Sequence, residues 1–96
     1  MPDFASARNS KSFDKKLSKE ELIRAIRFSI SAEFEAIQIY EQIAESTDNK
    51  KAKAVLEDII REEKVHAGQF LGVLYDLAPS ELAEIEKGQK ENQDLK

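Results

Sequence analysis

Two long stretches of this chain repeat apolar residues at steps of three and four, and neither contains a proline. The first extends from Ser18 to the polar cluster at residues 46–49, and the second extends from Asn49 to Leu77. This spacing places the apolar residues on one side of an α-helix, and no useful length alternates with the period of two that is typical of a strand. The chain is therefore predicted to be all-α, with two helices of about 28 residues, each roughly 42 Å long.

Local signals predict where the first helix begins and where the chain turns back. Ser18 and Glu21 have the spacing of a capping box, which indicates a helix that begins near Lys19. The cluster at 46–49, Ser-Thr-Asp-Asn, has turn chemistry, and its threonine or aspartate can cap the second helix. Two helices of equal length joined by a short turn form an antiparallel hairpin.

The end of the chain predicts one more short element. Pro79 ends the second helix, and a third helix over 80–86 is expected to end at Gly88. The expected organisation is a flexible leader (1–17), a helical hairpin domain (18–88) and a frayed C-terminal tail (89–96).

Composition excludes several kinds of site and partner. The chain has no Cys, which rules out disulfides, thiolate metal sites and cysteine nucleophiles, so any redox chemistry has to use oxygen and nitrogen ligands. The net charge is −4, and the body that follows the basic leader is acidic, which argues against nucleic acid and in favour of cations. No apolar run reaches about 18 residues, so we expect no membrane and a cytoplasmic location.

Both apolar stripes contain polar residues at their middle. The first stripe includes Glu33 and Tyr40, and the second includes Glu63 and His66, the only histidine of the chain. Glu33 lies about 14.5 residues before the centre of the turn and Glu63 about 15.5 after it, so both lie roughly 22–23 Å from the turn. His66 is one turn beyond Glu63 on the same side of its helix. The predicted stripes are Leu22, Ile26, Ile30, Glu33, Ile37, Tyr40 and Ala44, and Ala52, Leu56, Ile59, Glu63, His66, Phe70, Val73 and Leu77.

Two carboxylates that face each other in a core need compensation. Without it, their burial costs several kcal/mol or forces one of them to take up a proton. The nearest basic residues, Arg27, Arg61 and Lys64, lie off the stripes. A bound metal compensates better, and oxygen ligands with one imidazole suit iron, manganese or zinc.

One hairpin supplies two Glu and one His, which is half of the ligand set of a di-iron helical bundle: a Glu from each of two helices and a Glu-x-x-His from each of two others. A two-fold dimer supplies the other half. Its four Glu balance the charge of two divalent ions, and the dimer covers the apolar stripes. The hairpin is therefore expected to dimerise into a ferritin-like four-helix bundle.

Segments 31–41 (SAEFEAIQIYE) and 61–66 (REEKVH) resemble the encapsulated ferritin family, and the resemblance covers about residues 18–87. It implies a ferroxidase that oxidises iron(II) with dioxygen at a site shared by two subunits, with two irons per dimer. By the same match Glu33, Glu63 and His66 are ligands, and Tyr40 neighbours the centre. Manganese, zinc or calcium are possible in vitro.

The resemblance also implies an assembly and a location. Members form a ring of dimers, such as a decamer, and deliver iron for storage inside an encapsulin shell in the cytoplasm. Glu35 keeps one of two acidic positions that the family associates with the path of the metal, and Glu62 is a further candidate there. The other position is Ala32, and some members have Trp where this chain has Ile39. Residues 88–96 do not resemble the docking peptide of cargo proteins.

Two other functions are compatible with these residues. A di-iron peroxidase of the rubrerythrin kind uses the same ligands, although a chain without Cys has no rubredoxin-type centre. A metal-free helical module for dimerisation or for binding partners is the alternative of a different class. Replacement of Glu63 or His66 distinguishes it, because a scaffold tolerates the loss of buried charge.

Overall fold

The computed structural model describes residues 16–95, which form three helices and no strand. These are α2 (Lys19–Glu45), α3 (Lys50–Leu77) and α4 (Pro79–Gln93). The predicted all-α class is confirmed, and so are the start at Lys19 and the end at Leu77. Most of the predicted leader lies outside the described residues. None of the three helices is long and apolar enough to cross a membrane.

Side chains cap both helices of the hairpin. The Ser18 hydroxyl accepts a hydrogen bond from the Glu21 amide at 3.1 Å, and the Glu21 carboxylate accepts one from the Ser18 amide at 2.8 Å, which confirms the capping box. At the turn the predicted cap is wrong. Asn49 caps α3 by accepting from the Ala52 amide at 2.9 Å, while the Thr47 hydroxyl accepts from the Asn49 amide inside the turn. The Thr47 hydroxyl is thus engaged in a hydrogen bond within the turn, so Asn49 caps α3 in its place.

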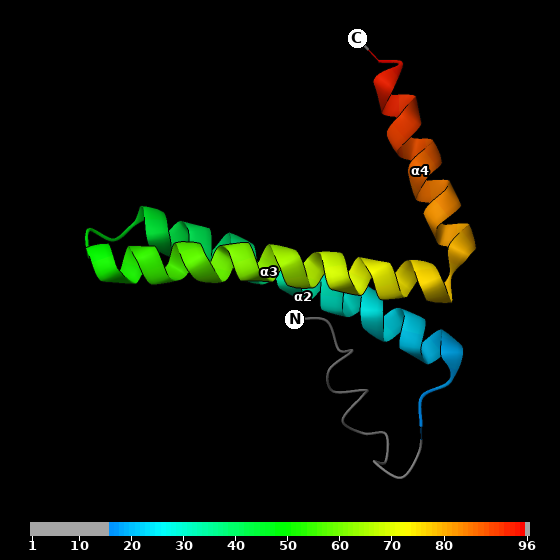
Figure 1. Cartoon of the computed structure of the whole chain (residues 1–96), viewed down its shortest axis with the longest axis horizontal. Coiled ribbons are helices and arrows are strands. Elements are labelled where there is room, and N and C mark those ends of the chain that lie inside the picture. Colours follow the sequence, from blue (N-terminus) through cyan, green and yellow to red (C-terminus); the bar gives the residue numbers. More distant parts are fainter. Residues whose placement is uncertain (1–15, 96) are drawn as a thin grey trace.

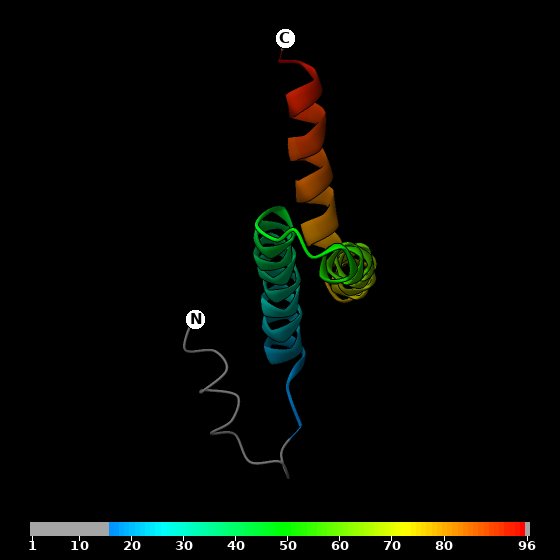
Figure 2. The same ribbon diagram turned by 90° about the vertical axis from the view of Figure 1, so that its left-hand side faces the viewer.

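Helices α2 and α3 run antiparallel and lie side by side (Figures 1 and 2). Ile37 and Ala44 of the predicted α2 stripe are buried, but on α3 the buried line is rotated by one residue from the predicted one. Ala52 and Val73 are exposed there. The reason is geometric: the line that is buried depends on how the two helices pack against each other, and a stripe of apolar residues on one helix does not specify this. The buried residues are Ala25, Ile37, Ala44, Ile60, Ala67 and Leu74.

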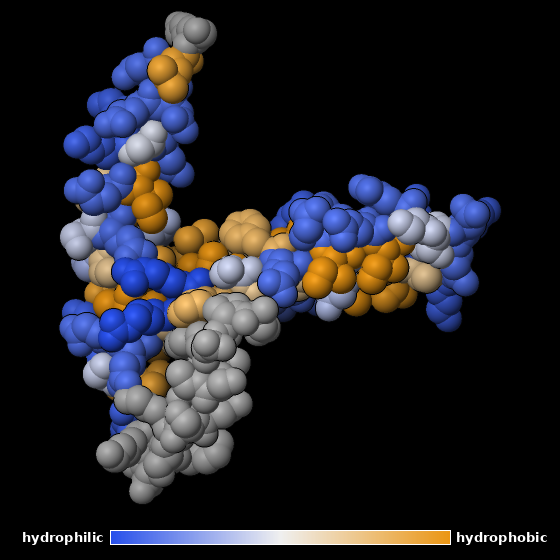
Figure 3. Space-filling view, turned by 180° about the vertical axis from the view of Figure 1, so that it is seen from behind, coloured by the Kyte–Doolittle hydropathy of each residue, from blue (hydrophilic) through white to orange (hydrophobic). Residues whose placement is uncertain are grey.

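Large apolar side chains lie in solvent outside the contact between the two helices, and most of them are not members of the predicted stripes. Ile39 and Ile43 on α2 are 45% and 48% exposed, and Val55 and Val73 on α3 are 49% and 43% exposed. At 100° per residue, these four positions fall on one flank of the hairpin. Viewed from behind, hydrophobic side chains gather along the hairpin while α4 is mostly hydrophilic (Figure 3).

Helix α4 leaves the end of α3 steeply and points away from the hairpin (Figures 1 and 2). It continues to Gln93, so the predicted end at Gly88 is wrong, and residues 89–93 of the expected tail are helical. Gly88 does not adopt the positive φ that makes glycine a helix terminator. It is flanked by Lys and Gln, which are good helix formers, and these carry the helix past it.

Because Gly88 lies inside a helix, replacing it by Ala should stabilise α4. A Cβ at this position meets nothing within 4 Å, and alanine is favoured over glycine in a helix interior by roughly 0.5–1 kcal/mol. We expect amide hydrogen exchange over residues 85–93 to slow by about two- to fivefold. Faster exchange in Gly88→Ala would mean that Gly88 ends the helix in a left-handed conformation after all.

Candidate metal centre

The structure brings together the three residues that the sequence predicts as metal ligands. Glu33 comes from α2, and Glu63 and His66 come from adjacent turns of α3. Each offers one ligand atom, and these atoms all lie within 4.8 Å of one another. His66 Nδ1 is 3.7 Å from Glu33 Oε1 and 3.9 Å from Glu63 Oε1. Their convergence follows from the antiparallel register, which sets the two glutamates at similar distances from the turn.

The cluster is closed on the side of the hairpin core and open on the other. The side chains of Glu33 and Glu63 are 16% and 20% exposed, whereas that of His66 is 45% exposed. Glu33 Oε2 is buried and has no hydrogen-bond partner among the described residues. A buried carboxylate oxygen without a partner is costly unless something that is absent from the lone chain satisfies it.

Electrostatics make the cluster a good place for a cation. The pKa of Glu33 is raised by a hydrogen bond with the Glu63 carboxyl, by burial and by repulsion from the Glu63 charge, while His66 lowers it. Without a cation, the pair therefore favours holding a proton. A metal ion can replace that proton and use the unsatisfied oxygen, and two carboxylates with one imidazole fit iron, manganese or zinc.

Two of the three basic residues nearest in sequence pair with other carboxylates. Arg27 pairs with Glu81 of α4, and Arg61 pairs with Asp58 one turn away on its own helix at 3.2 Å. The sequence predicts that these residues lie off the stripes, but it does not predict their partners.

The remaining predicted residues lie around the cluster or away from it. Tyr40 is half-buried and lies two turns along α2 from Glu33. Glu35 and Glu62 are exposed to solvent, and neither belongs to the group of three. The roles of Tyr40, Glu35 and Glu62 stay predictions.

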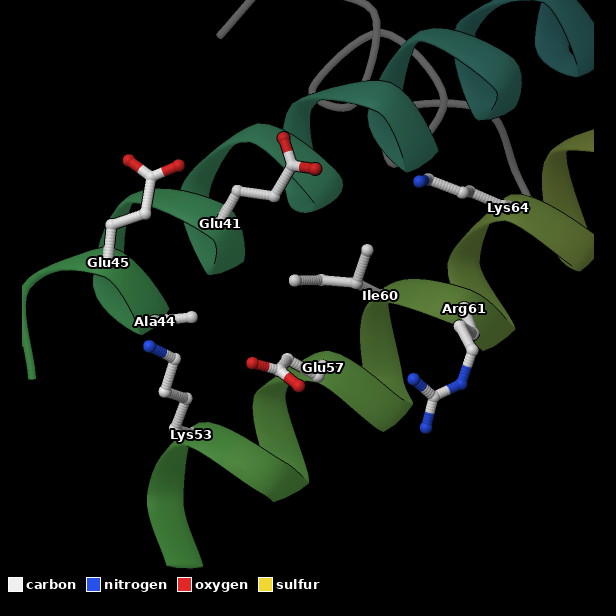
Figure 4. Close-up of a pocket in the computed structure, with 8 residues that line it drawn as sticks. All are labelled: Glu41, Ala44, Glu45, Lys53, Glu57, Ile60, Arg61 and Lys64. Carbon is white, nitrogen blue, oxygen red and sulfur yellow. The ribbon is translucent and has the colours of Figure 1, made fainter. Parts of the chain in front are cut away.

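A separate groove lies between α2 and α3 nearer the turn (Figure 4). Carboxylates of α2 lie on one wall and mostly basic side chains of α3 on the other, over a floor that includes Ala44 and Ile60. Because carboxylates and cations are mixed at its rim, the groove lacks the excess negative charge that would favour a metal ion. Its lining residues are Glu41, Ala44, Glu45, Lys53, Glu57, Ile60, Arg61 and Lys64.

The raised pKa of Glu33 predicts how the metal-free protein responds to pH. A carboxyl whose pKa is higher in the folded than in the unfolded protein contributes stability at low pH, and this contribution is lost as the pH rises through the folded pKa. Glu33→Gln keeps the shape and removes the charge. In the presence of a chelator we expect this variant to unfold at higher urea concentration than the parent at pH 7, with the difference vanishing below the ordinary pKa of the carboxyl. Equal midpoints at both pH values would contradict the repulsion between the glutamates.

A helical hairpin on which a Glu lies beside a Glu-x-x-His has the fold and the residue pattern that are typical of ferritin-like proteins. The chain belongs to the rubrerythrin family, whose family model matches residues 24–94, and within it to the encapsulated ferritins, as the sequence resemblance predicted. The crystal structure of an encapsulated ferritin domain from Pyrococcus furiosus superposes with a TM-score of 0.85 at 37% identity. The match covers 91% of this chain and 89% of that one.

Two curated relatives give the wider context. One is a ferritin-like–encapsulin shell fusion protein of Pyrococcus furiosus, 39% identical over 82 residues, which are 85% of this chain and 24% of the relative. The other is the encapsulin nanocompartment cargo protein EncC of Myxococcus xanthus, 39% identical over 69 residues, which are 72% of this chain and 53% of the relative. The chain thus matches about a quarter of one relative and about half of the other.

Proposed function

We propose that this protein is a ferroxidase that oxidises iron(II) to iron(III) with dioxygen at a di-iron site shared between two copies. The observation that carries the proposal is the convergence of Glu33, Glu63 and His66, together with a buried Glu33 oxygen that has no hydrogen-bond partner within residues 16–95. Iron is the substrate: each iron(II) loses one electron to dioxygen. Membership of the rubrerythrin family supports a role in iron chemistry.

The residues of the cluster would supply negative charge that stabilises iron(III) and would hold the irons in place. Carboxylates stabilise iron(III) more than iron(II), because the added positive charge interacts more strongly with their negative charge. Glu63, on the turn adjacent to His66, is the proposed bridge between two irons, and Glu33 and His66 are the proposed terminal ligands. Because the cluster lies near the middle of α2 and α3, the proposed ligands are far from the helix ends, which fray most readily.

A second copy would complete the site. One hairpin provides three ligands, which is too few to enclose an ion, and its open side is the side where His66 is exposed. The flank with Ile39, Ile43, Val55 and Val73 is the apolar surface that such a copy would cover. The dimer would then hold two irons between four Glu and two His. A ring of such dimers, for example a decamer, is part of the same proposal.

The proposed partner is an encapsulin shell, with the protein acting inside the nanocompartment in the cytoplasm. Both curated relatives support this, since one is fused to an encapsulin shell and the other is a cargo protein of an encapsulin nanocompartment. Residues 89–93, which do not resemble a docking peptide, form the last turn of α4.

The experiment that tests the function is aerobic iron(II) oxidation by the protein and its ligand variants, developed in the Discussion. A rubrerythrin-like peroxidase would instead oxidise iron(II) with hydrogen peroxide faster than with dioxygen. Comparison of the two oxidants in the same assay separates these activities.

A further inference from the structure

Within the part of the chain that the structure describes, helix α4 packs little against the other helices. None of its residues from Pro79 to Gln93 is buried, and one residue, Ala78, separates it from α3. No side chain caps its first turn. A fifteen-residue helix with so little packing should pivot about its connection unless another contact fixes it.

Such a contact joins α4 to α2. Arg27 Nε donates hydrogen bonds to both carboxylate oxygens of Glu81, at 3.1 and 3.2 Å, and its Nη2 donates a third to Oε1. Glu81 lies in the first turn of α4, just beyond the pivot, and its side chain is 22% exposed. The hydrogen bonds from Arg27 hold the pKa of Glu81 below its ordinary value, so the carboxylate is charged at neutral pH.

We propose that Arg27 and Glu81 form a clasp that fixes the direction in which α4 leaves the hairpin. Several hydrogen bonds between a planar guanidinium and a carboxylate fix the relative orientation of the two groups as well as their distance. An ion pair with a single contact fixes only the distance. Pro79 complements the clasp, because it keeps the preceding Ala78 out of helical geometry (φ −136°, ψ 73°) and so prevents α3 and α4 from merging into one straight helix. The proline enforces a bend, and the clasp selects its direction.

The clasp can be tested without reference to iron. Because the 96-residue chain has no Cys, a Lys51→Cys/Lys90→Cys protein carries only the two spin labels that are introduced, one near the start of α3 and one near the end of α4. Dilution with an excess of unlabelled protein suppresses distances between copies. Pulsed electron paramagnetic resonance then reports the distance between the two ends within one chain. We expect one narrow distance peak in the parent and a broad distribution in Arg27→Gln and in Glu81→Gln.

Matched variants separate the clasp from a general effect of charge. Arg24→Gln and Glu84→Gln remove exposed charges from the same two helices and should leave the peak narrow. The double variant Arg27→Glu/Glu81→Arg restores a pair of opposite charges. Its distance distribution should therefore be narrower than that of Arg27→Glu alone or Glu81→Arg alone. Because both side chains are partly exposed, the hairpin should stay folded in every variant, as circular dichroism can verify. A narrow peak in Arg27→Gln and Glu81→Gln would overturn the proposal, and so would broadening of equal size in the control variants.

Discussion

Replacing His66 by Ala should reduce the initial rate of iron(II) oxidation in air by more than about 100-fold. Replacing a residue that hydrogen-bonds to a metal ligand typically lowers metal affinity or activity by about 10- to 100-fold. Replacing the ligand itself should lower the activity further. In the proposed dimer the same substitution would remove two histidines, because each copy would contribute one to the shared centre. The measurement is stopped-flow absorbance of iron(III) after mixing the protein with iron(II) in aerated buffer. Glu63→Gln should have an effect of similar size.

The control for this experiment is Glu57→Gln. Glu57 is an exposed glutamate of the same helix, about two turns from Glu63, and it lies outside the group of three. Its replacement removes a negative charge from α3 without touching the cluster, so the rate should stay at the parental value. Unchanged oxidation by a folded His66→Ala protein would refute the assignment of the site and leave the metal-free scaffold as the better interpretation.

Divalent metal should convert the protein from smaller species to dimers and larger assemblies. A ligand that binds only one state stabilises it by about 2.7 kcal/mol when its concentration is a hundred times its dissociation constant. If the dimer alone binds the ion, each bound ion therefore raises the association constant for dimerisation by about a hundredfold. Analytical ultracentrifugation or native mass spectrometry with and without iron(II), under anaerobic conditions, measures the shift.

The ligand variants make the assembly experiment specific. His66→Ala should lose most of the metal-induced shift while retaining the assembly that apolar contacts provide in the absence of metal. A metal-loaded monomer would contradict a shared site. That result would still be compatible with an oxidation site formed by one chain. The rate of iron(II) oxidation by the variants tests that site separately.

The helices and the candidate centre could be predicted because both follow from local periodicity. The capping box at Ser18 gives the start of α2, and equal spacing from the turn sets Glu33 opposite Glu63. His66 joins them because residues three apart on a helix are neighbours. Each step needs only helical geometry and one antiparallel pairing.

Other features depend on tertiary arrangement and were missed. Arg27 and Glu81 are 54 residues apart, and no periodic pattern links them before the direction of α4 is known. Gly88 has a sequence context compatible with either a helix end or a helix interior, and a glycine alone does not decide between them. The rotation of the buried line on α3 by one residue reflects how two helices pack, which a stripe of apolar residues on one helix does not specify.

Within residues 16–95 only six side chains are buried and three of them are alanine, which has a consequence for how the proposed shared centres would accumulate in a cell. For a centre made from two copies, its amount at low expression rises with the square of the chain concentration, by mass action. Copies that had not formed the proposed dimer would leave their apolar flank exposed, so proteases would remove them faster than assembled copies. Doubling synthesis would then raise the number of working centres about fourfold at first, which makes the response to an iron load steeper than linear.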